Sequence, residues 1–214
     1  GKVADSAVIK LADGKLAYLT KRFDRHFKQE AETPSKNIHF EDLSQIIGIE
    51  QFDGSYELAG QAIAKIVLNE FLSALLAQFY LGNNDFHLKN IALMGLTKSG
   101  KYEDLSPLYD CINVESLLRD TGRQDEMAIS YFADDDFYTD DFLVDGHASF
   151  STFKHLYEIF GIKETVLKKA LKLINSKHAQ NLKLVEASIL SEADKDSFWY
   201  ILKDRLKKLN KHSY

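Results

Sequence analysis

Two short apolar runs near the start of the chain predict β-strands, because each is bounded by polar and turn-forming residues. Residues 7–11 form the first run and residues 16–20 form the second. The dipeptide Asp13-Gly14 between them favours a two-residue hairpin turn. A sheet of two strands is only marginally stable in water, so we expect this hairpin to need further strands.

The next apolar pattern has the period of an α-helix. The polar stretch 27–37 predicts a surface loop, and a short helix is expected to run from residue 39 to Gly48. One or two core helices are expected between residues 58 and 80, with residues 53–57 supplying the turn and cap. The apolar residues that recur there at helical spacing are Ile63, Ile66, Val67, Phe71, Leu75, Leu76 and Phe79.

A polar segment then separates two apolar stretches. Residues 84–90 form this segment, and residues 91–94 and 102–106 predict a pair of strands joined by a turn. Such a hairpin would bring Asn90, before its first strand, and Asp110, after its second, to the same end of the ribbon.

The second half of the chain predicts mostly helices. Residues 127–131 alternate like a strand, whereas the six Asp residues within 133–145 indicate a solvated acidic loop without the spacing of a calcium loop. An aromatic cluster at 150–160 is expected in the core, and Gly161 is expected to end a helix. Three further helices are expected at residues 164–176, 179–190 and 192–209. The basic stretch 203–211 predicts a solvated helix face.

Composition and charge narrow the class of protein. The length of 214 residues predicts one or two domains, and 45% hydrophobic with 28% charged residues is ordinary for a globular protein. A net charge of −5 gives no general attraction to nucleic acid. The single cysteine, Cys111, excludes an intrachain disulfide and is expected to be a small buried residue. We see neither a signal peptide nor an apolar run long enough for a bilayer, so we expect a cytoplasmic location without membrane contact.

The strongest chemical signal is an acid, an amide and a second acid. In protein kinases, one Asp accepts the proton of the attacking hydroxyl, and an Asn and a second Asp hold Mg²⁺ against the nucleotide phosphates. The spacing from Asp85 to Asn90 matches the kinase pattern H-R-D-x-x-x-x-N. In this chain, however, His87 follows the first acid, and the second acid lies in Tyr109-Asp110-Cys111 instead of D-F-G.

Four motifs, in the same order, resemble the C-terminal kinase domain of HipA-type toxin kinases. Residues 19–25 resemble the hinge between the two lobes of that family, and residues 41–45 resemble a segment next to its catalytic cleft. The other two motifs are N-D-x-H-x-K-N at residues 84–90 and S-P-L-Y-D at residues 106–110. The last part of the chain is similar to the family only in helical character.

The resemblance implies an α+β fold: the mostly helical C-lobe of a bilobal, protein-kinase-like fold, with a short β-hairpin remnant of the N-lobe at the start. It divides the chain into an N-lobe remnant with the hinge, residues 1–24, and a helical C-lobe, residues 25–214. It also implies serine/threonine kinase activity, with ATP and Mg²⁺ as cofactors.

The resemblance also implies roles for individual residues. Asp85 is the catalytic base, and Asn90 and Asp110 are the Mg²⁺ ligands. His87 and Lys89 support the catalytic loop, and Lys89 is also a candidate for contact with the transferred phosphate.

Further roles concern the nucleotide, the substrate and the partners. The resemblance implies that Lys21 and Phe23 offer backbone groups to adenine, that Asp24 lies near the ribose, and that Gln45 is close to the substrate. Family members act as toxins of toxin–antitoxin modules and phosphorylate an aminoacyl-tRNA synthetase. A helix-turn-helix antitoxin restrains them, so contact with DNA is expected only indirectly, through that partner.

The chain departs from the family before the hinge. Only nine residues precede Lys10, and they contain neither a Gly-rich phosphate-binding loop nor the strand Lys of a kinase N-lobe. We therefore expect most of the N-lobe to be absent, either by truncation or because a separate chain carries it. Two alternatives stay open: a catalytically silent pseudokinase that docks an antitoxin or partner chain, and a metal-dependent phosphohydrolase built on another scaffold.

Overall fold

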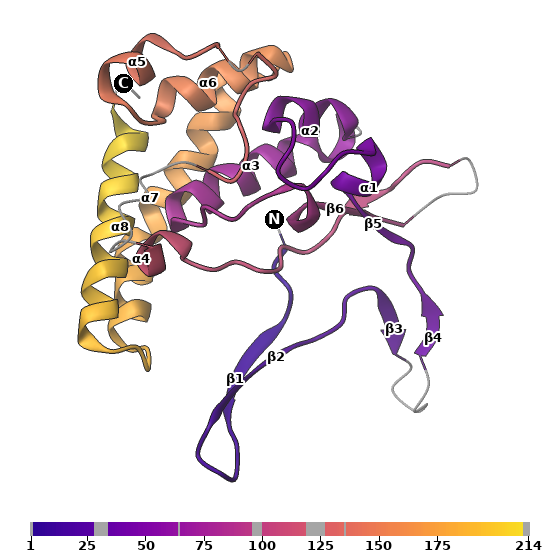
Figure 1. The fold of residues 1–214 in the computed structure, drawn as a ribbon, viewed down its shortest axis with the longest axis vertical. Helices are drawn as coiled ribbons and strands as arrows, with labels where there is room; N and C mark the ends of the chain where they lie inside the picture. Colours follow the sequence, from indigo (N-terminus) through magenta and orange to yellow (C-terminus); the bar gives the residue numbers. More distant parts are fainter. Residues whose placement is uncertain are drawn as a thin grey trace.

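The computed structural model describes residues 2–27, 34–63, 65–95, 100–118, 127–134 and 136–211. The architecture is α+β, with small sheets in the first half of the chain and helices in the rest (Figure 1). The strands are β1 Ser6–Lys10, β2 Leu16–Thr20, β3 Arg25–Phe27, β4 Pro34–Asn37, β5 Phe40–Asp42, β6 Ala92–Met94 and β7 Asp104–Leu105. The helices are α1 Leu43–Ile47, α2 Tyr56–Ala62, α3 Lys65–Leu81, the 3-10 turn η1 Leu88–Asn90, α4 Val114–Leu118, α5 Asp140–Asp145, α6 Phe150–Ile159, α7 Glu164–Glu186 and α8 Glu192–Asn210.

The predicted first hairpin is present, and its turn is one residue longer than expected. Strands β1 and β2 pair antiparallel from Ser6 opposite Thr20 to Lys10 opposite Leu16. The Leu11 N–H donates to the Lys15 carbonyl at 2.7 Å, which leaves three residues in the loop. Gly14 has a φ of 86°, the left-handed conformation that the third residue of such a loop requires. The two-residue turn was therefore a wrong prediction.

A three-stranded sheet, ordered β5-β6-β7, lies beside the helices. Strands β6 and β7 form the predicted second hairpin, with Leu93 opposite Leu105. The expected helix start at residue 39 is wrong, because residues 40–42 pair with β6 as an edge strand. Asp42 ends that strand and caps α1: its side chain accepts the N–H of Gln45 at 2.9 Å.

Helix α3 is the centre of the helical body and packs against both α7 and α8. The core helices predicted between residues 58 and 80 are thereby confirmed. The two helices expected at 164–176 and 179–190 are a single helix, α7, because no Gly or Pro interrupts the stretch between them. Near its middle, His178 Nδ1 lies 2.9 Å from the hydroxyl of Tyr80 on α3.

The segment 127–131 is not a strand of a sheet. It runs past the start of α2, where the carbonyls of Ser130 and Tyr131 accept the N–H groups of Tyr56 and Glu57 at 2.9 and 3.1 Å. These donors belong to the first turn of α2, where the backbone N–H groups have no hydrogen-bond acceptor within the helix itself. The acidic stretch that follows contains the short helix α5 as well as exposed loop residues, so its description as a loop was incomplete.

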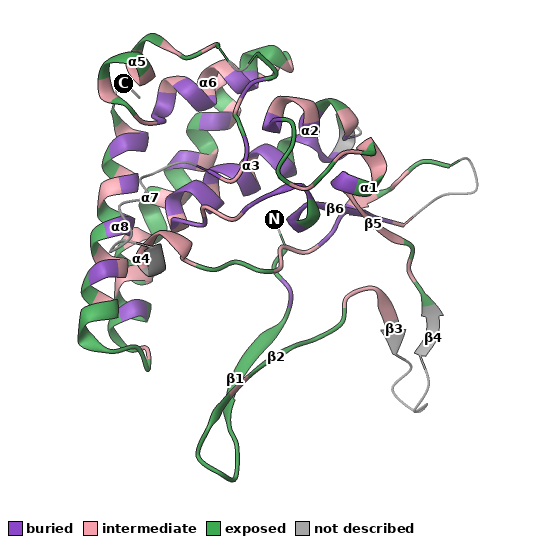
Figure 2. Cartoon of the chain, in the orientation of Figure 1, coloured by how far each residue is buried: buried purple, intermediate pink, exposed green. Residues whose placement is uncertain are grey.

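The helices contain many buried residues, whereas strands β1 and β2 are mostly exposed (Figure 2). The aromatic residues of α6 are buried as predicted. The basic end of α8 is solvated only in part: Lys203, Lys207 and Lys211 are exposed as expected from the sequence, whereas Arg205 and Lys208 are buried. None of the helices in the described ranges combines the length and the apolar character needed to cross a bilayer.

Candidate active site

The segment 84–90 leaves the end of α3 and is anchored by its own apolar residues. Phe86 and Leu88 are buried in the core. The hydroxyl of Tyr56 donates to the Phe86 carbonyl at 2.8 Å, and the Leu88 N–H donates to the Gln51 carbonyl at 3.2 Å. Because these residues alternate with polar ones, anchoring them holds the intervening polar side chains in place.

Asp85 lies at the solvent edge of this loop, with 40% of its side chain exposed. Its carboxylate is 4.0 Å from Nε2 of His87, and the rings of His87 and Phe52 are nearly perpendicular, with centroids 4.9 Å apart. The Asp85 N–H donates to the side-chain oxygen of Asn83 at 3.2 Å. The carboxylate is therefore oriented by its backbone yet accessible, as a proton acceptor for a bound hydroxyl must be.

Asn90 is buried at the other end of the loop and ties the loop closed. Its side-chain nitrogen donates to the Asp85 carbonyl at 2.9 Å. This bond uses the amide nitrogen, so the amide oxygen is the atom of Asn90 that suits a hard cation. The bond also couples a predicted metal ligand directly to the residue predicted as the catalytic base.

Asp110 lies beside the loop in a conformation that few residues adopt. Its φ of 52° is the only positive value at a non-glycine position in the described ranges. The side chain of Asn83 donates to the Asp110 carbonyl at 3.1 Å, and the Tyr109 hydroxyl donates to the Lys89 carbonyl at 2.5 Å. The predicted convergence of the Asn90 and Asp110 segments is thus observed. A strained backbone held by several bonds is typical of functional sites.

A cleft of about 650 Å³ opens next to Asp110. It contains all three residues predicted to bind the nucleotide, and Asp110 lines its wall. The lining residues are Tyr18, Thr20, Lys21, Arg22, Phe23, Asp24, Phe40, Tyr109, Asp110, Cys111 and Ile112. The cleft therefore joins the hinge-like segment to the predicted metal ligand.

Three aromatic rings form one wall of this cleft. The Phe23 ring centroid lies 5.5 Å from that of Phe40 and 5.7 Å from that of Tyr109, and Phe23 and Tyr109 are stacked. Burial raises the pKa of Tyr109, so its phenol stays neutral and keeps its bond to the loop. Sequence reasoning missed this wall, because Phe40 and Tyr109 become neighbours of Phe23 only in the folded chain.

Charged groups set the polar side of the cleft. The Arg22 guanidinium donates to both carboxylate oxygens of Asp24, at 2.9 and 2.5 Å, and this hydrogen bonding lowers the pKa of Asp24. The Lys21 N–H donates to the Asp5 carbonyl at 2.8 Å. Of the Lys21 backbone groups, the carbonyl is therefore the one suited to accept a bond from a ligand.

Other predicted residues lie away from the cleft. Lys89 is exposed on the loop, and Gln45 is exposed on α1 without lining the cleft. Cys111 borders the cleft and is exposed, contrary to the expectation of a buried residue, and Nε2 of Gln78 lies 3.1 Å from its sulfur. Asn83 holds both the loop and the Asp110 segment, a role that sequence reasoning missed.

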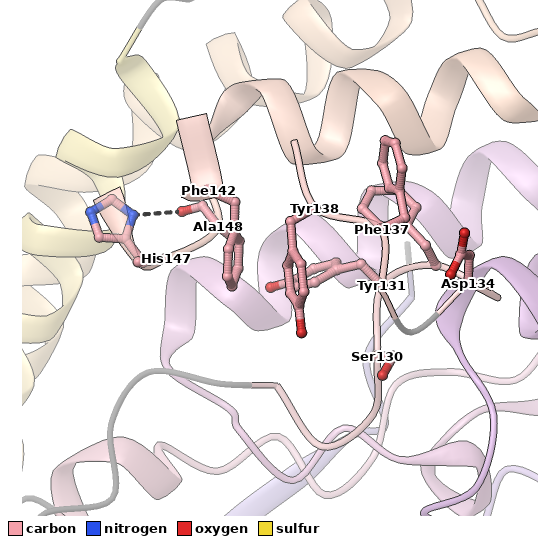
Figure 3. A pocket seen from close by; sticks show the side chains of 10 residues that line it. Ser130, Tyr131, Asp134, Phe137, Tyr138, Phe142, His147 and Ala148 are labelled. Atoms are coloured by element: carbon pink, nitrogen blue, oxygen red, sulfur yellow. Dashed lines mark hydrogen bonds between the residues drawn. The ribbon is translucent and has the colours of Figure 1, made fainter. Parts of the chain in front are cut away.

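A second, smaller cavity of about 70 Å³ is lined by residues of the segments 130–138 and 146–148 and by Phe142 of α5. Tyr138 and Phe142 lie side by side there next to Tyr131 (Figure 3), with the rings of the first two 4.8 Å apart. None of the predicted site residues lines this cavity.

Within the described ranges, no group of three or more His, Cys, Asp or Glu could hold a metal ion. A cation at the candidate site would therefore need ligands such as the Asn90 amide or phosphate oxygens.

Comparison with known proteins identifies the family of this chain. The sequence model of the HipA-like C-terminal domain matches residues 1–182. The chain is similar to HipA of Shewanella oneidensis MR-1, from a toxin–antitoxin complex with HipB and operator DNA, with a TM-score of 0.70 and 16% identity over 97% of this chain. It is also similar to the Helicobacter pylori proinflammatory kinase CtkA, with a TM-score of 0.58 and 17% identity over 99% of this chain and 79% of that one.

These likenesses confirm the predicted fold, the mostly helical α+β C-lobe of a kinase-like architecture. The chain spans about half the length of HipA, 51% of that chain. A comparison with curated protein sequences found no match.

Proposed function

The chain belongs to the HipA-like C-terminal domain family, and from this premise we propose that it is the C-lobe of a serine/threonine protein kinase that uses ATP and Mg²⁺. One observation carries the proposal: the hinge-like residues and Asp110 line one cleft, and hydrogen bonds tie the Asp110 segment to the loop of Asp85 and Asn90. A phosphotransferase needs these parts side by side, because it works mainly by positioning and by neutralising charge.

In the proposed mechanism, Asp85 orients the substrate hydroxyl and accepts its proton. The exposed carboxylate and the backbone bond to Asn83 suit this role. The Asn90 amide oxygen and the Asp110 carboxylate would hold Mg²⁺, which when bound neutralises the phosphate charge that develops during transfer. The bond from Asn90 to the Asp85 carbonyl fixes the position of the proposed metal ligand relative to the proposed base.

The cleft supports a nucleotide in a defined orientation. The rings of Phe23, Phe40 and Tyr109 offer an apolar wall for adenine. The Lys21 carbonyl and the Phe23 backbone would meet the edge of the base. Asp24, kept ionised by Arg22, would accept hydrogen bonds from the ribose.

The proposal extends to the partners. HipA was solved with HipB and operator DNA, and by analogy we propose a helix-turn-helix antitoxin as partner, with DNA contacted only through it. An aminoacyl-tRNA synthetase is the proposed substrate class by family resemblance. The β1–β2 hairpin exposes apolar side chains, Tyr18 among them. We propose that this hairpin packs against the remainder of a kinase N-lobe, in the same chain or in a separate one.

The decisive experiment is Asp85→Asn in a protein that includes an N-lobe. Phosphoryl transfer from ATP should fall by about 10²–10⁴-fold, the usual contribution of a general base. Nucleotide affinity should stay nearly unchanged, because Asp85 does not line the cleft. Asp196→Asn, at an exposed acid of α8, is the matched control. Unaltered turnover in the Asp85 variant would refute the assignment.

A metal titration separates the remaining alternatives. For a kinase, Asp110→Ala should abolish Mg²⁺-dependent ATP binding measured by calorimetry. A pseudokinase would bind a partner chain without transferring phosphate. A phosphohydrolase would cleave a phosphate ester without nucleotide, and the cleft beside the hinge-like segment disfavours that reading.

A further inference from the structure

The buried arginine of α8 lies at the base of the candidate active site. Arg205 has 0% of its surface exposed, the largest fully buried side chain in the described ranges. A guanidinium is rarely buried unless its charge is paired and its donors are used. Helix α8 also lies beyond residues 1–182, the part of the chain that the family model matches.

The partners of Arg205 explain its burial. Its Nε and one terminal nitrogen donate to the same carboxylate oxygen of Glu115, at 2.9 and 2.7 Å. Its guanidinium carbon lies 4.4 Å from the centre of the Phe79 ring on α3. The terminal nitrogen also makes a long contact, 3.5 Å, with the side-chain oxygen of Asn84, the residue before Asp85.

The same contacts reach the point where the catalytic loop begins. The Glu115 N–H donates to the Gly82 carbonyl at 3.1 Å. A Cβ on Gly82 would lie 2.7 Å from a methyl group of Ile201, one turn before Arg205 on α8. The side chain of Asn113 donates to the Leu81 carbonyl at 2.7 Å.

The contacts of Arg205, Glu115 and Asn113 therefore hold two segments of the site in place. One is the loop of Asp85 and Asn90, which starts at Gly82. The other is the segment that carries Asp110 and continues through Asn113 into α4, where Glu115 lies. A charge-assisted network in a dry interior is directional, so it can fix the relative position of the two segments more tightly than apolar packing.

We propose that Arg205 is a positioning residue of the candidate active site: through Glu115 and Asn84 it sets the geometry between the Asp85 loop and the Asp110 segment. The proposal rests on the proposed kinase function for its catalytic consequence. Its structural content, an ordered loop at residues 82–90, can be measured without any activity.

The test uses a pair of substitutions that separates positioning from stability. Arg205→Leu alone removes the guanidinium from the largely buried Glu115 carboxylate and should destabilise the fold. Adding Glu115→Leu removes that carboxylate as well, and such apolar replacement of a buried ion pair is often neutral or stabilising. Thermal unfolding of the double variant should therefore return close to that of the wild type.

Loop order and catalysis should not return in the double variant. Amide hydrogen exchange in peptides covering residues 82–90 should stay at least about tenfold faster than in the wild type, an effect of the size expected when local opening becomes easier. In the protein with an N-lobe, kcat should fall about tenfold or more while KM for ATP changes little. Lys195→Met, which removes an exposed pair with Glu192 on the same helix, is the control and should change neither value.

Wild-type exchange and wild-type kcat in a stable double variant would overturn the proposal and leave Arg205 a purely structural residue. Should the double variant not fold, Arg205→Lys decides, because it retains charge but not the two-pronged bond: faster loop exchange supports the proposal and unchanged exchange refutes it. If the wild-type protein transfers no phosphate, the kinase proposal fails, whereas the exchange measurement still tests Arg205.

Discussion

The helical body and the β1–β2 hairpin contain similar apolar residues but use them in opposite ways. In α3, Phe71 and Leu75 are fully buried. In the hairpin, Leu16 and Tyr18 are exposed over 58% and 68% of their surface, on a ribbon that projects from the body (Figure 1). Large exposed apolar side chains gathered on one element indicate a surface that another structure covers.

The contrast shows which part of the chain is stable by itself. Helices α3, α7 and α8 pack against one another, whereas the hairpin forms a sheet of two strands within the described ranges. The cleft is lined by hairpin residues such as Thr20 together with Asp110, which lies in the segment before α4. The part of the candidate site that the hairpin supplies is therefore expected to be less stable than the rest of the site.

The largest effect should come from truncating the core of the body. Phe71→Ala should lower the free energy of unfolding by about 3–5 kcal/mol, through lost burial and the cavity left behind. Tyr18→Ala in the hairpin should change it by less than about 0.5 kcal/mol. Denaturant titration of both variants measures the comparison, and equal losses would show that the hairpin belongs to the cooperative core.

The next largest effect concerns the contact between α8 and Gly82, which lies before the loop of residues 84–90. Gly82 has a φ of 72° and faces Ile201 without room for a Cβ, whereas Gly146 has a φ of 70° with open space around it. Gly82→Ala should cost about 2–4 kcal/mol from strain and overpacking, and Gly146→Ala only about 1–2 kcal/mol from its backbone. Similar thermal shifts in the two variants would mean that the contact with α8 has no energetic weight.

A smaller effect compares a buried helix cap with an exposed one. Ser55 is buried and accepts the Leu58 N–H at 3.1 Å, and Ser191 is exposed and accepts the Asp194 N–H at 3.2 Å. Ser55→Ala should cost about 1–2 kcal/mol, because water cannot replace the lost partner, and Ser191→Ala about 0.5–1 kcal/mol. Urea unfolding would contradict this if Ser191→Ala proved the costlier change.

The smallest effect concerns the pH dependence of stability that arises from the contact between α3 and α7. Burial lowers the pKa of His178 beside Tyr80, so the folded state favours the neutral imidazole. Stability from this group is therefore complete above the ordinary histidine pKa of about 6.5, and it declines as the pH falls from there through the lower folded-state pKa. His178→Gln should reduce the slope of unfolding free energy between pH 7 and pH 5, and an unchanged slope would refute the assignment.

Prediction from the sequence succeeded where local pattern and short spacing decide the outcome. The β1–β2 hairpin follows from two apolar runs around Asp13-Gly14, and α3 follows from apolar residues at helical spacing. The site assignment, from Asp85 and Asn90 five residues apart together with the hinge-like motif, stays a prediction. The strand predicted at residues 127–131 was wrong, because the carbonyl of Ser130 caps a helix far away in the sequence instead of joining a sheet.

By itself, the sequence determined the main helices, the β1–β2 and β6–β7 hairpins and the order of the motifs, because these depend on neighbours along the chain. Only the tertiary structure decided that Phe40 and Tyr109 pack against Phe23, that Asp110 adopts a left-handed backbone, and that Arg205 is buried in contact with Asn84. A basic residue on a helix predicts a solvated face, since transfer of a charge from water is costly. That cost is offset here by a carboxylate 90 residues away, a pairing that no local pattern can reveal.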